Sequence, residues 1–151
     1  TCSARNAELV RAYGADHAID YTRGNVLNVL QAWAPAGVDL VVDAVGLGSL
    51  PADIARVMRA GGRIVSIYTA IRDVELFDAA LAAERQVEII PNLTGLERQD
   101  DHLAGVVAAI DAGRLRPPPV TEMALEDVAE AHRQSQAGHV RGKIVLRVAE
   151  L

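Results

Sequence analysis

Short aliphatic runs alternate with amphipathic segments along most of this 151-residue chain. The clearest run, residues 38–43, is rich in β-branched side chains, ends in Asp43 and is followed by Gly46 and Gly48. Runs of this length predict buried strands, whereas apolar residues at helical spacing predict helices. Strands that alternate with helices through short connections favour a mostly parallel sheet with helices on both faces. We therefore predict an α/β fold with a doubly wound sheet.

The same patterns predict the approximate bounds of each element. Ser3 can cap a first helix that ends at Gly14, and the Gly61-Gly62 pair can end a later one. The other helices are expected over residues 24–34, 49–60, 76–84, 99–112 and 123–138. The strands are expected over residues 16–21, 38–43, 63–68, 87–90 and 143–148.

A proline tripeptide, Pro117-Pro118-Pro119, separates the last expected helix and strand from the rest of the chain. Consecutive prolines form a stiff connector. We therefore expect residues 1–116 to form the main layered domain and residues 117–151 to pack outside its sheet.

Composition narrows the possible partners. Apolar residues make up 50% of the chain and charged residues 23%, which suits a packed core. A net charge of −5 without a basic block argues against nucleic acid. Apolar stretches fall short of the ~20 residues that cross a bilayer. No secretion leader opens the chain, so we expect a cytoplasmic protein without membrane contact.

The metal-binding residue types show no ligand spacing. Cys2 is the only cysteine, so an internal disulfide or a cysteine-rich zinc site is excluded, and we expect a small residue at a strand end. The four histidines are scattered along the chain without a neighbouring cysteine or carboxylate motif. We expect no bound metal.

Several stretches, in order along the chain, carry a family likeness. They are residues 13–17, 19–21, 38–46, 61–66, 131–132 and 142–146. Together they resemble the C-terminal portion of medium-chain dehydrogenases/reductases, in the zinc-free NADPH-dependent quinone oxidoreductase branch. The resemblance implies a Rossmann-like cofactor domain without its first strand and glycine-rich loop, followed by a segment that returns to the catalytic lobe. It also implies hydride transfer to a quinone, enone or similar carbonyl in the whole enzyme, with the isolated chain inactive.

The amino-terminal hexapeptide bears on the choice of coenzyme. In NAD-specific folds a carboxylate at the end of the second strand binds the ribose 2′-hydroxyl. Residues 1–6 contain no acid but offer Ser3 and Arg5, which can bind a phosphate. The hexapeptide therefore predicts NADPH. By the resemblance, Tyr21 joins this site, and Asn6 stands where the family has a lysine. The alternative is that Ser3 caps a helix and Arg5 is solvated.

Other candidate residues follow the expected strands. Gly46 and Gly48 would let the backbone approach the adenosine ribose, and Asp43 would orient this loop or bind a ribose hydroxyl. An ordinary turn with a structural carboxylate is the alternative. By the resemblance, the residues from Ser66 to Thr69 and Asn92 would lie toward the nicotinamide. No catalytic residue is identified.

Two other functions stay open. The chain could be a non-catalytic scaffold that forms a homodimer through residues 87–90, as similar proteins do. A methyltransferase is disfavoured because it would need an acidic residue at the second strand end. Without the first strand of the fold, one flank of residues 38–43 would be unpaired. We therefore expect the isolated chain to be poorly soluble, rearranged or associated.

Overall fold

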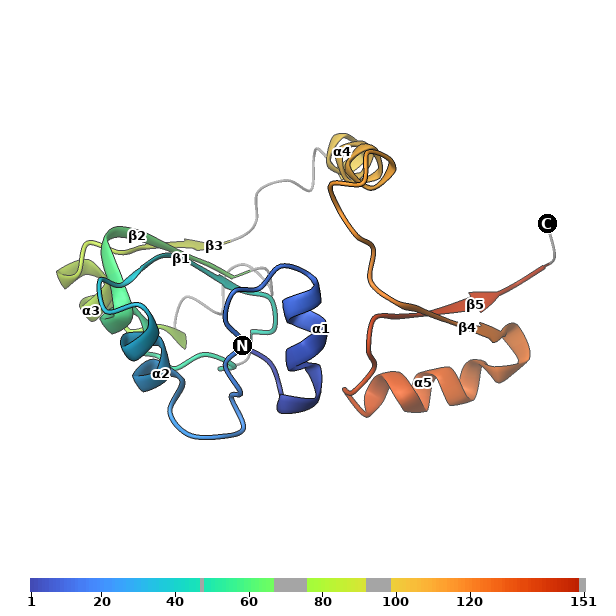
Figure 1. Ribbon diagram of the computed structural model, residues 1–151, viewed down its shortest axis with the longest axis horizontal. Coiled ribbons are helices and arrows are strands. Elements are labelled where there is room, and N and C mark those ends of the chain that lie inside the picture. Colours follow the sequence, from blue (N-terminus) through green and yellow to red (C-terminus); the bar gives the residue numbers. More distant parts are fainter. Residues whose placement is uncertain (47, 67–75, 92–98, 150–151) are drawn as a thin grey trace. The chain divides into compact units, whose positions relative to one another are not determined.

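Figure 1 shows the computed structural model, which describes residues 1–46, 48–66, 76–91 and 99–149. Contacts divide the chain into two units, Thr1–Gln99 and Asp100–Leu151. The boundary between these units precedes the proline tripeptide. The assignment of residues 117–151 to another lobe stays a prediction.

A parallel sheet forms the centre of the first unit, with the strand order β1-β2-β3. Its strands are β1 (Val38–Asp43), β2 (Met58–Ser66) and β3 (Glu88–Pro91). Val41 lies beside Ile64, and Ile64 lies beside Ile89. Aliphatic residues thus meet on one face of all three strands. The parallel α/β architecture predicted from the sequence is confirmed.

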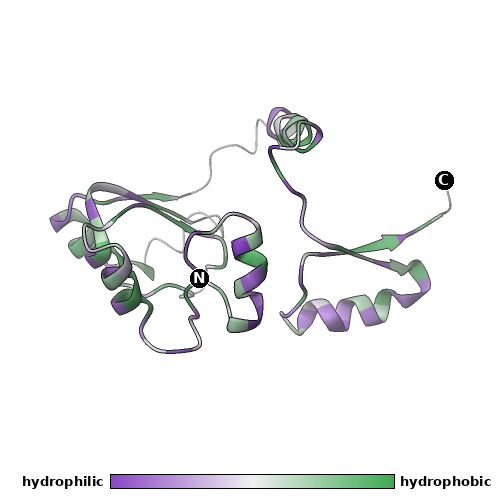
Figure 2. Cartoon of the chain, viewed as in Figure 1, coloured by the Kyte–Doolittle hydropathy of each residue, from purple (hydrophilic) through white to green (hydrophobic). Residues whose placement is uncertain are grey.

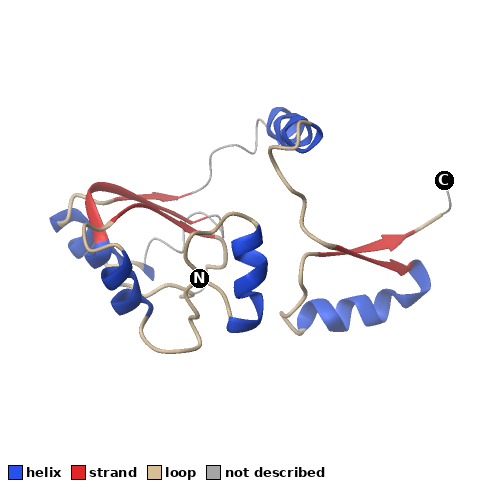
Figure 3. Ribbon diagram, in the orientation of Figure 1, coloured by secondary structure: helices blue, strands red, loops and turns tan. Residues whose placement is uncertain are grey.

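Helices pack against this aliphatic face (Figures 1 and 3). They are α2 (Val26–Trp33), the short 3-10 helix η2 (Ile54–Val57) and α3 (Ala79–Glu84). The side chain of Asn25 begins α2 by accepting hydrogen bonds from the amides of Leu27 and Asn28. At the centre of the core, Ile54, Met58 and Ile64 are at most 1% exposed. This packing holds the carboxyl ends of β1 and β2 in place.

The other face of β1 is open in the first unit. Leu40 and Val42 are 52% and 56% exposed, whereas Val41 between them packs against the core. Within the described residues, β1 pairs with β2 alone, so its other edge has no partner strand. This confirms the expected unpaired flank of residues 38–43, as far as the structure describes the chain.

We expect the isolated chain to associate through this open flank, since apolar edge strands pair with other chains. Leu40→Lys should weaken the association by about fivefold, because like charges placed across paired strands cost up to about 1 kcal/mol. Sedimentation velocity over a concentration series measures the change. Val148→Lys, at an exposed valine of the second unit, is the control and should change nothing. A wild-type chain that stays monomeric at high concentration contradicts the expectation.

The amino-terminal segment is attached through a short parallel pairing. The amide of Cys2 donates to the carbonyl of Ile19 at 2.9 Å, and the amide of Tyr21 donates to the carbonyl of Cys2 at 3.4 Å. Cys2 and Asp20 form an isolated bridge, so the strand expected over residues 16–21 is reduced to one paired position. The first helix follows as η1 (Ala4–Asn6) and α1 (Ala7–Ala12). Cys2 is buried and forms no disulfide bond, and it lies at the paired position, as expected for a small residue at a strand end.

The helix expected over residues 49–60 is wrong. Its helical part is limited to the four residues of η2, and β2 already begins at Met58. Gly61 and Gly62 lie inside β2 instead of ending a helix. A Cβ atom on Gly62 would come within 2.9 Å of the carbonyl oxygen of Arg59 and 3.2 Å of that of Asp39. The glycine is needed because backbones approach closely at a bulge in this strand pair.

The second unit contains a short strand–helix–strand arrangement, which follows helix α4 (Gln99–Asp111). The arrangement consists of β4 (Val120–Ala124), η5 (Leu125–Asp127), α5 (Val128–Gln136) and β5 (Lys143–Arg147). β4 and β5 pair in parallel, with Met123 beside Leu146. Figure 2 shows hydrophobic colour over β5 and hydrophilic colour along much of α5. The expected helix over residues 123–138 therefore begins later, because Met123 belongs to a strand. Among the described helices, none has the length and hydrophobicity that crossing a bilayer requires.

Candidate functional site

A cavity of about 410 Å³ lies at the carboxyl end of β1. Its lining comes from the amino-terminal segment, from the end of β1 and from the loop that follows. The lining residues are Thr1, Tyr21, Val42, Asp43, Ala44, Val45, Ser49 and Leu50. The carboxyl edge is where open α/β sheets bind their ligands. Tyr21 and Asp43, both predicted from the sequence, therefore line the same cavity.

Asp43 orients the loop after β1. Its Oδ1 accepts hydrogen bonds from the amides of Val45 at 3.1 Å and Gly46 at 3.0 Å, and from the hydroxyl of Ser49 at 2.8 Å. Burial raises the pKa of Asp43, but the bonds from Gly46, Val45 and Ser49 outweigh it, so the pKa lies below its ordinary value. The ionised carboxylate thus holds the loop, and its contact with a ribose stays a prediction.

Two polar residues of this region were missed or only loosely placed from the sequence. Ser49 was not predicted, although a serine that follows a strand-end aspartate and glycines is a usable signal for such a bond. Ser66 ends β2 beside Asp43 in the parallel register. It is 7% exposed, and within the described residues its Oγ has no hydrogen-bond partner. A buried hydroxyl left unsatisfied costs about 1–3 kcal/mol, so Ser66 fits a site that receives a polar ligand atom.

The predicted phosphate-binding residues lie at the amino-terminal segment. Ser3 has an extended backbone before η1, and its side chain makes no capping hydrogen bond. The expectation that Ser3 caps a helix is therefore wrong, since the helix begins as a 3-10 turn instead. Arg5 lies on the exposed surface of η1. Thr69 and Asn92, the residues expected near the nicotinamide, lie outside the described residues.

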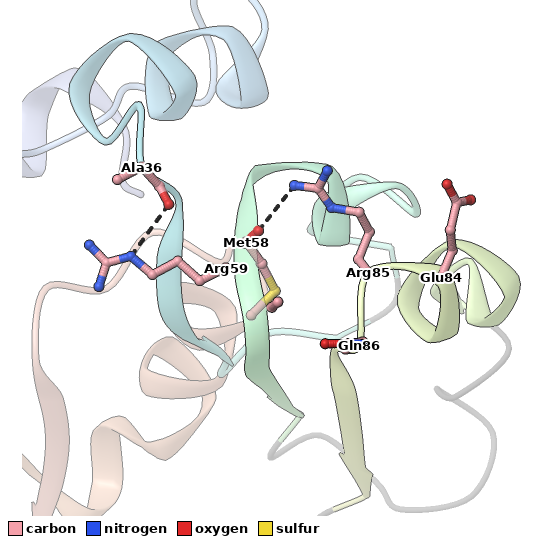
Figure 4. A pocket seen from close by; sticks show the side chains of 7 residues that line it. Ala36, Met58, Arg59, Glu84, Arg85 and Gln86 are labelled. Carbon is pink, nitrogen blue, oxygen red and sulfur yellow. Dashed lines mark hydrogen bonds between the residues drawn. The ribbon is translucent and has the colours of Figure 1, made fainter.

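A second cavity, of about 420 Å³, lies at the opposite edge of the sheet (Figure 4). Arg59 and Arg85 border it, but both guanidinium groups are engaged within the protein. Arg59 donates to both carboxylate oxygens of Asp39 at 2.9 and 3.0 Å. Arg85 donates to the carbonyls of Arg56 and Met58 at 3.1 and 3.2 Å. These arginines connect neighbouring elements, so the cavity at the carboxyl edge is the stronger candidate.

Metal ligands do not gather in the part of the chain that the structure describes. Within it, no three histidine, cysteine, aspartate or glutamate side chains lie close enough to hold a metal ion. These residues do not form a zinc site by themselves.

Comparison with known proteins identifies the family and the fold of the chain. The sequence profile of the family described as zinc-binding dehydrogenase matches residues 13–146. The chain is 27% identical over 148 residues to the NADPH-dependent alkenal/one oxidoreductase, chloroplastic, of Arabidopsis thaliana. That alignment covers 97% of this chain and 32% of the relative.

Two solved structures show the same fold. An NAD-dependent alcohol dehydrogenase superposes with a TM-score of 0.78 at 25% identity, over 97% of this chain and 42% of that one. The quinone oxidoreductase from Coxiella burnetii superposes with a TM-score of 0.71 at 28% identity, over 98% and 44%. The chain thus spans about a third of the plant relative and less than half of each solved chain. The predicted fold class and family are confirmed: this chain belongs to the zinc-binding dehydrogenase family, with the Rossmann-type fold of medium-chain dehydrogenases.

Proposed function

We propose that this chain is the NADPH-binding portion of a zinc-independent oxidoreductase that transfers hydride to a quinone, enone or similar carbonyl. The main observation in support of this function is the cavity at the carboxyl end of β1, which Tyr21 and the loop held by Asp43 both line. The relatives support a nicotinamide coenzyme, since one is named as NADPH-dependent and a solved neighbour as NAD-dependent. The choice between the two coenzymes therefore depends on this chain's own residues.

The described residues fit such a coenzyme at two places. The hydride chemistry belongs to the nicotinamide ring, whereas the chain binds and orients the coenzyme. The loop held by Asp43 would place backbone against the adenosine ribose, and the buried Ser66 hydroxyl would contact a polar group at the neighbouring strand end. At the amino-terminal segment, Ser3, Arg5 and Tyr21 would surround the 2′-phosphate. The hydroxyl of Ser3 makes no helix-capping hydrogen bond.

Arg5→Ala should weaken NADPH binding by roughly 10- to 100-fold, because a hydrogen bond to a charged group contributes about 1.5–3 kcal/mol. NADH, which lacks the 2′-phosphate, should bind with unchanged affinity. Isothermal titration calorimetry on the protein in its full natural length measures both constants. Arg11→Ala on the neighbouring helix α1 is the matched control. Equal wild-type affinity for the two coenzymes, or no effect of Arg5→Ala on NADPH, would remove the proposed 2′-phosphate site.

A second candidate function is a dimerisation module. β3 lies at one edge of the described sheet, and its residues Ile89 and Ile90 are half-buried. An edge of this kind can pair with the same edge of a second copy, giving a homodimer through residues 87–90. The net charge of −5 favours small molecules over nucleic acid or a membrane surface as further partners. We also propose that the protein is cytoplasmic.

A further inference from the structure

Residues 1–6 contain no acidic residue, but Asp20 lies next to them in the folded chain. Asp20 lies opposite Cys2 in the parallel bridge, so it is beside the residues that lead to Ser3. The backbone amide of Ala4, which follows Ser3, contributes to lowering the pKa of Asp20. The two segments on which Ser3 and Tyr21 lie are therefore joined at Asp20.

The carboxylate of Asp20 is used inside this junction. Its Oδ1 accepts hydrogen bonds from the amide of Thr22 at 3.0 Å and from the Thr22 hydroxyl at 2.7 Å, which closes a turn directly after Tyr21. Its Oδ2 is buried without a hydrogen-bond partner among the described residues, although Nε of Arg23 lies 3.5 Å away. The Thr22 hydroxyl is the main cause of the low pKa of Asp20, followed by the Thr22 amide. The group is thus ionised at neutral pH.

These contacts fix the main chain on both sides of Tyr21. The amide of Tyr21 itself donates to the carbonyl of Cys2, and the next residue is held by Asp20. The side chain of Tyr21 remains 56% exposed and lines the cavity, whereas Asp20 does not. The Asp20 carboxylate therefore holds the residue that follows Tyr21 and does not itself line the cavity.

We propose that Asp20 is a positioning residue for recognition of the coenzyme's 2′-phosphate. By closing the Thr22 turn and joining it to the amino-terminal segment, it holds Tyr21 and Ser3 at a fixed separation. The inference rests on the function proposed above. It also explains how a carboxylate can stand beside a phosphate site, since its oxygens face Thr22 and Arg23.

The test compares two nucleotides that differ by one group, 2′,5′-ADP and 5′-AMP, by calorimetric titration of the protein in its full natural length. Asp20→Ala should lower the affinity for 2′,5′-ADP by about tenfold and that for 5′-AMP by less than about twofold. Asp20→Asn keeps an acceptor oxygen for Thr22 and should restore most of the affinity. Thr22→Val, which removes the hydroxyl and keeps the amide, should give an intermediate loss.

Tyr21→Phe combined with Asp20→Ala should cost less than the sum of the single changes, because both act on one contact. An equal loss of both nucleotides in Asp20→Ala, or no rescue by asparagine, overturns the positioning role. If Asp20→Ala proves unfolded by circular dichroism, Thr22→Val decides, and the same affinity as wild type overturns the inference. A wild-type protein that binds the two nucleotides equally rejects the proposed NADPH site itself.

Discussion

Replacing Asp43 with alanine is expected to lower the free energy of unfolding by about 2–4 kcal/mol and to abolish coenzyme binding. The change removes the acceptor of three hydrogen bonds, donated by Val45, Gly46 and Ser49, from a residue that is 4% exposed. The donors would be left without this partner and the loop would lose its orientation. Chemical denaturation measures the stability, and calorimetric titration with NADPH measures the binding.

Two milder variants separate the charge of Asp43 from its hydrogen bonds. Ser49→Ala removes one donor and should cost about 0.5–1.5 kcal/mol. Asp43→Asn keeps an acceptor oxygen but cannot ionise. Because folding lowers the pKa of Asp43, its ionisation stabilises the native state above the unfolded pKa of about 3.9, and this contribution is lost as pH falls through the lower folded pKa. The asparagine variant should therefore lose less stability than wild type below about pH 4. Parallel pH curves for the two proteins would contradict the assigned role.

Gly142→Ala should destabilise the second unit by about 3–5 kcal/mol, enough to separate β4 from β5. A Cβ atom at this position would overlap the carbonyl of Pro119, and the backbone φ of Gly142 is 88°. The same carbonyl accepts a hydrogen bond from the amide of Lys143 at 2.9 Å, at the start of β5. Moving Pro119 away would break that bond and the register of the pair.

Gly138→Ala provides the matched control in the same unit. Gly138 also has a positive φ, of 68°, but a Cβ atom there would meet nothing within 4 Å. Its cost should be limited to backbone strain of about 1–2 kcal/mol. Circular dichroism during chemical denaturation compares the two variants. Equal effects would mean that the contact with Pro119 contributes nothing.

Elements whose signal is local were predicted well. The β-branched run over residues 38–43 coincides with β1, and the helix expected over 99–112 matches α4 within a residue. The helix over 49–60 failed because Ile54, Val57 and Met58 reach the core from a single turn and a strand start, which imitates helical spacing. β4 was missed because Thr121 and Glu122 give it no aliphatic run, and its pairing depends on the distant β5.

The candidate site was predicted only in part. Tyr21 and Asp43 could be identified from strand ends and family resemblance, and both line one cavity. Ser49 and Asp20 were not predicted, although both make local hydrogen bonds, over six residues from Ser49 to Asp43 and over two from Thr22 to Asp20. Residues 1–6 contain no acidic residue, but in the folded chain Asp20 lies beside them through its bridge to Cys2.

The single oxygen atom that secures the loop after β1 limits how this family member can evolve. Any substitution that reshapes the loop through Asp43 also changes the integrity of the fold, so selection acts on both properties together. Substitutions of Tyr21 are more independent of fold stability, because this residue is 56% exposed and can be exchanged at little cost to the core. Under the proposed function, changes in coenzyme preference are therefore expected at exposed positions such as Tyr21, while Asp43 is retained.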